Sequence, residues 1–285
     1  MLWTKARRSN NVNDTRQGKD ARTLTGKTLG AGVAAIALAG AGLYSTLGTA
    51  PEPSTNTLPQ PVTSLSIEPA EDVQLMFVQS VLGDTEDTWK QLFAQTGRHY
   101  PQPALTLFNH GVTSACGYAD SSSGPFYCPS DQQVYLDLEF FNKLEQQHSV
   151  IGDFARAYII AHEVGHHVQL ELGLSAPFEH ALANQRPISG DGGLEVRAEL
   201  QADCLAGVWA FHAQQRLDWL EPGDIEAALH AAAAFGDDQL QRSRNAPVRP
   251  ETFSHGTSEQ RVNWFKTGFD SGLPETCDTF AATDL

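Results

Sequence analysis

Apolar side chains recur at helical spacing in four segments of the second half of the chain, residues 152–173, 194–216, 223–236 and 258–272. This periodicity predicts four helices. Asp153 is expected to cap the start of the first one, and Gly173 to end it. Residues 71–96 predict one or two further amphipathic helices, with a break near Gly83 and Asp84.

Two shorter segments, residues 103–110 and 132–140, are rich in β-branched and aromatic residues and partly alternate between apolar and polar positions. This pattern predicts strands. Residues 175–193 predict a loop-rich insertion between two of the helices. The order of elements, mostly helices with a small sheet early on, indicates an α+β domain.

Residues 29–50 follow neither pattern, because they form an uncharged run that reads LGAGVAAIALAGAGLYSTLGTA. A helix of about 20 such residues would cross a bilayer. Seven basic residues precede the run: Lys5, Arg7, Arg8, Arg16, Lys19, Arg22 and Lys27. The positive-inside rule then predicts a single-pass protein of the cytoplasmic membrane, with the N-terminus in the cytoplasm and the domain periplasmic or extracellular. A cleavable signal peptide, with Gly48 and Ala50 at cleavage-like spacing, is the alternative.

These features predict four regions. Residues 1–28 are a basic cytoplasmic head, 29–50 a transmembrane signal anchor, 51–69 a linker rich in Pro, Ser and Thr, and 70–285 the folded domain. The formal net charge of the chain is -15, and this acidic balance argues against nucleic acid as a partner. The expected partners are the membrane, through residues 29–50, and a substrate of the folded domain.

The chain has four cysteines, Cys116, Cys128, Cys204 and Cys277. An even number in an exported domain predicts two disulfides. Three pairings are possible. In one of them Cys116 and Cys128 close a short loop of turn residues, and Cys204 with Cys277 then ties a central helix to the C-terminal tail.

The segment YIIAHEVGHHVQLEL, residues 158–172, contains the pattern H-E-x-x-H at His162, Glu163 and His166. Positions i and i+4 share one face of a helix, so both imidazoles can bind one zinc ion. Glu163 is placed to take a proton from the attacking water and to deliver it later to the leaving amine. The neighbouring His167 is expected to be structural or exposed.

A third ligand must come from elsewhere in the chain. The metzincin pattern needs Gly and His where this sequence has Gln169 and Leu172, so that arrangement is excluded. The remaining candidates are four glutamates: Glu171, Glu179, Glu195 and Glu199. Glu171 and Glu179 are set aside because they lie too close in sequence to the two histidines, or in a loop. Glu199 is favoured over Glu195 because Asp203 follows at i+4, where it can accept the second ring N–H of a zinc histidine.

The segments HEVGHH and RAELQADCLAGVWA together resemble the Glu-zincin metallopeptidases, in which H-E-x-x-H is completed by E-x-x-x-D. In more detail, the chain resembles the putative neutral zinc metallopeptidase family of bacterial membrane-anchored proteins. Almost the whole chain carries this resemblance, through RRSNNVNDTR, the uncharged run, CGYADSSSGPFYCPSDQQVYLDLEFF, the two zinc helices and SHGTSEQRVNWF. The interval between His166 and Glu199 is longer than in the better-studied Glu-zincins.

The resemblance implies a zincin-like, mostly helical domain that holds one Zn²⁺. The segment SHGTSEQR has a spacing similar to the His-Pro-x-x-x-x-Arg element of membrane-linked Glu-zincins, which implies that His255 stabilises the oxyanion of the reaction. Arg261 is the arginine of this element, which lies by the zinc site in those proteins. The alternative for Arg261 is a structural ion partner, close to a helix cap at Ser258. Glu-zincins often bind substrate as an added strand, and residues 132–140 are the expected sheet edge.

The sequence thus predicts an exported zinc metallopeptidase, an endopeptidase of peptide or protein substrates. Its ligands are His162, His166 and Glu199, and Glu163 is its general base and acid. Two alternatives stay open, a non-catalytic zinc-containing interaction module and an amidase of cell-wall peptide. The presence of Glu163 argues against the first, because zinc binding alone does not require it.

Overall fold

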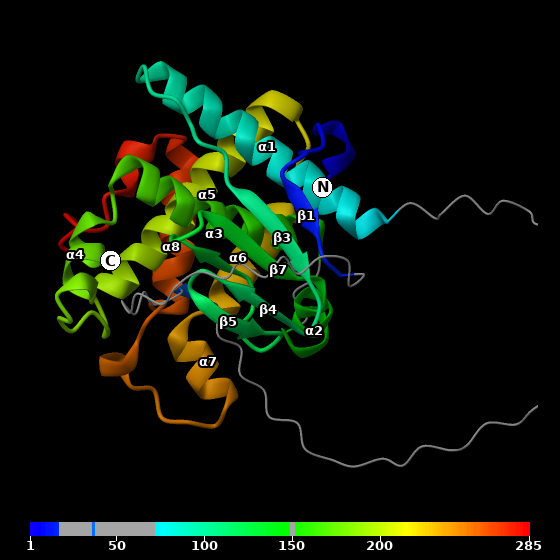
Figure 1. Cartoon of the computed structure of the whole chain (residues 1–285). Coiled ribbons are helices and arrows are strands. Elements are labelled where there is room, and N and C mark those ends of the chain that lie inside the picture. The colour runs from blue at the N-terminus through cyan, green and yellow to red at the C-terminus, as the bar shows by residue number, and fades with distance from the viewer. Residues whose placement is uncertain (17–35, 38–71, 149–151) are drawn as a thin grey trace, which may run out of the picture.

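The computed structural model describes residues 1–16, 36–37, 72–148 and 152–285 (Figure 1). Its main sheet has five strands in the order β1-β3-β7-β6-β2. β1 and β3 run parallel to β7, whereas β6 is antiparallel to β7 and β2 is antiparallel to β6. The bounds of these strands are β1 (Val12–Asp14), β2 (Ile36–Ala37), β3 (Ala104–Phe108), β6 (Phe126–Cys128) and β7 (Gln133–Asp137). A separate hairpin pairs β4 (Gly111–Ser114) with β5 (Gly117–Asp120).

Helices make up most of the described chain, and the α+β class is as predicted. They are α1 (Val73–Gln95), α2 (Leu138–His148), α3 (Asp153–Leu172), α4 (Ala176–Ala183), α5 (Leu194–Leu217), α6 (Asp224–Ala234), α7 (Asp237–Ser243) and α8 (Ser258–Ser271). Gly173 ends α3 in the left-handed conformation, as expected. The N-cap of α3 is Gly152 rather than Asp153. The segment 175–193 is also less irregular than predicted, because it contains α4.

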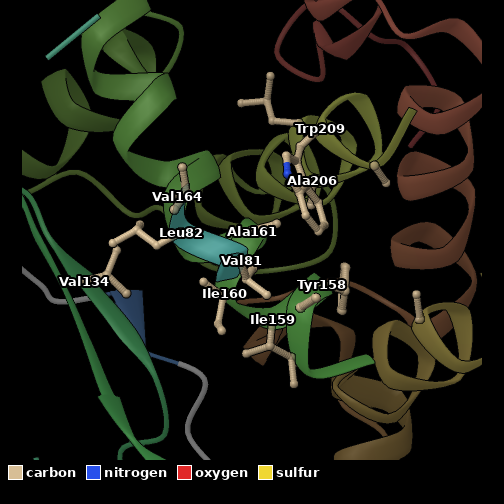
Figure 2. Close-up of a cluster of buried hydrophobic side chains, with 14 of the residues drawn as sticks. Val81, Leu82, Val134, Tyr158, Ile159, Ile160, Ala161, Val164, Ala206 and Trp209 are labelled. Atoms are coloured by element: carbon tan, nitrogen blue, oxygen red, sulfur yellow. The ribbon is translucent and has the colours of Figure 1, made fainter. Parts of the chain in front are cut away.

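The core lies between the sheet and α1, α3 and α5 (Figure 2). Val134 of β7, Leu82 of α1, Ile160 of α3 and Trp209 of α5 are all buried there. Each buried side chain of this size contributes about 1.5–3 kcal/mol to folding. α3 is buried along most of its length, and its buried residues include the polar His162, Glu163 and His166. The helix that carries H-E-x-x-H is therefore held rigidly at the centre of the domain.

α1 is one continuous helix across Gly83, so the predicted break is wrong. A Cβ at Gly83 would lie 2.4 Å from the carbonyl oxygen of Arg7. Glycine is therefore needed here for the close approach of another segment, not to end the helix. Asp84 is buried and paired with Arg216 and the Trp209 indole, so it too is compatible with the helix interior.

The segment that approaches Gly83 is the start of the chain. Residues 1–16, expected to belong to a separate basic head, are instead part of the folded domain. β1 adds a parallel strand beside β3, and the side chains of Arg7, Ser9 and Asn11 all donate hydrogen bonds to the Glu86 carboxylate. Glu86 is buried, so these bonds satisfy a charge that would otherwise be costly inside the protein. The rest of the predicted head, residues 17–28, lies outside the described residues.

The prediction of a transmembrane helix before the domain is corrected. In the described part of the chain, the helices are all too short or too polar to cross a membrane. Of residues 29–50 the structure describes only Ile36 and Ala37, and these form strand β2 against β6 instead of a helical turn. The pairing of Ile36 and Ala37 with β6 requires an extended backbone, which a continuous helix through these two residues would not allow. The remainder of the run and the predicted linker, residues 51–69, lie outside the described residues.

Two disulfides are present, Cys116–Cys128 and Cys204–Cys277. The first joins the turn between β4 and β5, which contains Cys116, to Cys128 at the end of β6. The second joins α5 to the short C-terminal 3₁₀ helix Pro274–Cys277. A cross-link of this kind stabilises the fold chiefly by restricting the unfolded chain.

The segment 132–140 is not a sheet edge. β7 ends at Asp137, where α2 begins, and it lies between β3 and β6. Both of its hydrogen-bonding sides are used within the sheet. β6 follows β7 towards the β2 edge of the sheet, and the side of β6 that faces away from β7 pairs with β2.

Candidate metal centre

α3 and α5 cross closely at Gly165. A Cβ at this position would lie 2.9 Å from the carbonyl oxygen of Ala202, so a larger residue would push the two helices apart. The crossing brings the H-E-x-x-H turn of α3 against Glu199, less than one turn before Ala202 on α5. Local helix geometry and one glycine thus bring together residues that are far apart in sequence.

The ligand atoms of His162, His166 and Glu199 lie within 4.8 Å of one another. His162 Nε2 is 3.1 Å from Glu199 Oε2, and His166 Nε2 is 3.5 Å from Glu199 Oε1. All three residues are buried. These are the three residues that the sequence predicted as zinc ligands.

Two of these atoms, His166 Nε2 and Glu199 Oε1, are buried without a hydrogen-bond partner among the described residues. Unsatisfied polar atoms of this kind are rare inside proteins, and an ion is one explanation. Two imidazole nitrogens and one carboxylate form the donor set of a catalytic zinc site with an open fourth position. The residues present therefore fit a zinc ion.

The second ring nitrogens of both histidines have partners that fix which nitrogen faces the cluster. His162 Nδ1 is 2.8 Å from Asp203 Oδ1, and His166 Nδ1 is 2.8 Å from Gln169 Oε1. Since the Gln169 amide also donates to the Ala198 carbonyl at 2.6 Å, its oxygen must face His166. Both Nδ1 atoms therefore carry the proton, and both Nε2 atoms are turned towards Glu199. The sequence predicted the role of Asp203 but not that of Gln169.

The charges of the cluster suit a cation. Burial lowers the pKa of His166 to about 4, so its imidazole is neutral. Burial alone would raise the pKa of Glu199, but the two histidines lower it to about 2, so the carboxylate is ionised. Burial alone would lower the pKa of His162, but Asp203 and Glu199 raise it to about 10. A bound metal would replace the proton that His162 shares with Glu199.

Glu163 lies beside the cluster without being one of its three ligands. It is 1% exposed, and its Oε2 has no hydrogen-bond partner within the described residues. Burial raises the pKa of Glu163 to about 8, and a nearby cation would lower it again. A carboxyl group that exchanges its proton near neutral pH can act as both base and acid.

Behind the cluster, Asp203 is held by Arg261. Arg261 Nε donates to Asp203 Oδ2 at 2.8 Å and Nη2 to Oδ1 at 2.9 Å. The Tyr158 hydroxyl donates to the same carboxylate at 2.5 Å. Arg261 is fully buried, so it is the structural ion partner that the sequence left as one alternative. The cap of α8 is Thr257 in a capping box with Gln260, not Ser258.

Comparison with known proteins agrees with this geometry. The family model described as "Putative neutral zinc metallopeptidase" matches residues 1–280. The chain belongs to this family. A relative from Escherichia coli K12, "Uncharacterized protein YpfJ", is 42% identical over 286 residues, covering 98% of this chain and 99% of its own. "Uncharacterized protein Rv2575" of Mycobacterium tuberculosis H37Rv is 44% identical over 207 residues, covering 69% and 67%. No solved structure matches the chain.

The family match begins at the first residue, in agreement with the packing of residues 1–16 on the domain. The zinc in the family description agrees with the donor set of His162, His166 and Glu199. The names of these two relatives state no activity.

His255 of this family member lies in a tight loop organised by Asp237. Asp237 Oδ2 accepts hydrogen bonds from the backbone N–H groups of Ser254, His255 and Gly256, at 2.7, 2.6 and 3.1 Å. The other oxygen, Oδ1, is 3.3 Å from His255 Nδ1. Burial alone would lower the pKa of His255, but Asp237 and Glu199 raise it. The charge of His255 in turn lowers the pKa values of Glu163 and Glu199.

Sequence reasoning missed Asp237. Its only signal is a position at the start of a short, polar helix, and nothing in the sequence links that helix to residues 254–256. Glu195, the rejected ligand, lies one turn before Glu199 and accepts a hydrogen bond from Ser189 at 2.9 Å. His167 is fully buried, which excludes the exposed position that was one of its two expected placements.

Proposed function

We propose that this protein is a zinc-dependent endopeptidase. The observation that carries the proposal is the buried trio of His162, His166 and Glu199. Within the described residues, His166 Nε2 and Glu199 Oε1 lack hydrogen-bond partners and face one another, and Glu163 Oε2 alongside also lacks one. A purely structural zinc site needs four protein ligands and no neighbouring base. Three ligands and a free carboxylate are the arrangement of a hydrolytic site.

Zinc bound to these residues would lower the pKa of a water molecule and polarise the substrate carbonyl. Glu163 then accepts the proton of the attacking water. The protonated Glu163 carboxyl can then deliver this proton to the leaving amine. The buried position of Glu163 keeps bulk water from competing for the proton.

His255 donates a hydrogen bond to the oxygen that becomes negative as the carbonyl is attacked. Support comes from Asp237, which holds the loop and raises the pKa of His255. A donor held in place before the reaction does not have to reorganise, and removal of such a donor typically costs about 10²–10³ in kcat.

The substrate is proposed to be a peptide or protein, in agreement with the family description, which names a metallopeptidase. β6 is not proposed as its binding edge, because both hydrogen-bonding sides of this strand are paired within the described residues, with β7 and with β2.

We also propose that the domain works in an oxidising compartment outside the cytoplasm. The support is its two disulfides, with no free cysteine in the described residues. Disulfides of this kind persist in exported proteins and are rare in the cytosol.

The test is hydrolysis of a library of mixed-sequence decapeptides by the purified full chain loaded with zinc. The proposal expects internal cleavage that stops on chelation with phenanthroline and returns when zinc is added. Cleavage of isolated cell-wall peptides alone would favour an amidase. No hydrolysis of either substrate by zinc-loaded, folded protein would contradict the enzyme proposal.

Replacement of Asp237 by Asn tests the role of His255. The amide oxygen of Asn can still accept the backbone hydrogen bonds, but the negative charge that raises the pKa of His255 is lost. The alkaline limb of the pH profile of kcat is therefore expected to move to lower pH by about one unit, the usual effect of one adjacent charge. Asp238→Asn, which changes the neighbouring residue paired with Arg242, is the control. Identical alkaline limbs in both variants would argue against a protonated His255 in the reaction.

A further inference from the structure

Two buried side-chain amides connect the metal cluster to the C-terminal tail. Gln169 Oε1 lies 2.8 Å from His166 Nδ1, and Gln169 Nε2 donates to Gln201 Oε1 at 3.1 Å. Gln201 Nε2 donates in turn to the carbonyl oxygen of Cys277 at 2.8 Å. Both glutamines are 1% exposed, and a buried amide left without a partner is costly. The Gln169–Gln201 amide pair therefore ties the position of His166 to that of Cys277.

The direction of every hydrogen bond in this series is fixed at its far end. A main-chain carbonyl can only accept, so the NH₂ group of Gln201 faces Cys277 and its oxygen faces Gln169. The oxygen of Gln169 is then left to face His166. Nδ1 of His166 carries the proton, and Nε2 keeps the lone pair that a metal needs. The Ala198 carbonyl, which also accepts from the Gln169 amide, imposes the same direction.

A disulfide holds the Cys277 carbonyl in this place. Cys277 ends the 3₁₀ helix Pro274–Cys277 and is bonded to Cys204 of α5. Both cysteines are buried. Cys204 follows Gln201 by less than one helical turn, so the cross-link fixes the acceptor beside the turn of α5 that carries the donor.

We propose that Gln201 and the Cys204–Cys277 disulfide position His166 for zinc, so that tight zinc binding depends on this cross-link. This inference rests on the zinc site of the proposed function. Without the disulfide, the Cys277 carbonyl is free to move away from α5, and Gln201 loses its acceptor. Gln169 then keeps only one of its two fixed acceptors, and the His166 ring is held less firmly. Partners of this kind orient a metal ligand without touching the metal.

The first part of the test compares Gln201→Met with Gln214→Met in the full chain. Methionine is about as long as glutamine but has no N–H to donate. Gln214 is the match because it also lies on α5 and both ends of its amide are bonded, Nε2 to Asp218 Oδ1 at 3.0 Å and Oε1 to the Leu220 N–H at 2.9 Å. It lies about 20 Å along the helix from Gln201.

The second part compares two double variants, Cys204→Ala with Cys277→Ala and Cys116→Ala with Cys128→Ala. Each lacks one of the two disulfides, and each is expected to lose stability, because a cross-link restricts the unfolded chain. Only the first lacks the cross-link that holds the acceptor of Gln201. The two parts are independent, since the cysteine variants keep Gln201 and Gln201→Met keeps all four cysteines.

The main readout is the zinc dissociation constant of the folded protein, measured by competition with a chromophoric chelator. The second is the visible spectrum of the Co²⁺-loaded protein, which reports the geometry of the ligands. Circular dichroism checks that each variant is folded.

We expect Gln201→Met and the variant without the Cys204–Cys277 disulfide to bind zinc about tenfold more weakly, the lower end of the usual effect of such partners. Their Co²⁺ spectra should also differ from that of the wild type, whereas both control variants should match it. Wild-type zinc affinity in either test variant, or an equal loss in its control, would overturn this inference while zinc binding by the wild type upholds the metal site. A folded wild type that binds no zinc would overturn the proposed function, and this inference with it.

Discussion

Glu163→Gln is expected to lower kcat for peptide hydrolysis by about 10²–10⁴-fold, the usual contribution of a positioned general acid and base. Glutamine has nearly the same shape but cannot carry a proton between the water and the leaving amine. Glu163 is not one of the three clustered ligands, so zinc content should stay at the wild-type value. The measurement is the rate of decapeptide cleavage beside metal analysis of the same sample.

Glu171→Gln is the matched control for this experiment. Glu171 lies on the same helix, and its carboxylate accepts a hydrogen bond from Gln132 at the protein surface. Its variant should cleave at the wild-type rate. If Glu163→Gln kept full activity with zinc bound, Glu163 would not be the base. A loss of zinc in this variant would instead make Glu163 a ligand and contradict the assignment of three ligands.

Arg261→Met is expected to cause the largest loss of stability, about 3–5 kcal/mol in the free energy of unfolding. Methionine fills much of the space but leaves Asp203 buried and without its cationic partner. The two hydrogen bonds from Arg261 to Asp203 would be lost. The pKa of Asp203, which Arg261 and His162 hold low against the effect of burial, should rise. Urea denaturation of the metal-free protein measures the change in stability.

Arg242→Met provides the comparison for an exposed arginine. Arg242 pairs with Asp238 at 2.7 Å, but its side chain is 59% exposed, and such surface pairs contribute about 1 kcal/mol or less. A similar, small loss in both variants would show that Arg261 does not hold a buried charge in place. A large loss of stability for Arg261→Met alone would support the interpretation that Arg261 fixes Asp203, which in turn orients His162.

The helices and the cluster of His162, His166 and Glu199 could be predicted from sequence because their signals are local. Apolar periodicity defined α3, α5 and α8 to within a few residues. The i and i+4 spacing of His162 and His166 places both on one helix face whatever the rest of the fold does. The choice of Glu199 also used a local signal, the carboxylate of Asp203 one turn later.

Other features depend on contacts between distant segments, which no local pattern reports. Gly83 seemed to break α1, but it is there for the close approach of the Arg7 backbone. The basic residues at the start suggested a separate head, whereas Arg7 and its neighbours bind the buried Glu86. Asp237 orients His255 across 18 residues of sequence. The uncharged run from residue 29 to residue 50 predicted a transmembrane helix through its length, its lack of charge and its basic flank, and none of these signals reports the pairing of Ile36 and Ala37 with β6.

The central claim is that His162, His166 and Glu199 bind one zinc ion. It is tested most directly by the zinc content of the purified full chain beside His162→Ala, Glu199→Ala and Glu195→Ala. The full chain is required because residues 1–16 are part of the fold. We expect one tightly held zinc per chain in the wild type and in Glu195→Ala, and its loss in the other two variants. A folded wild type without zinc, or zinc retained in Glu199→Ala and lost in Glu195→Ala, would contradict the site.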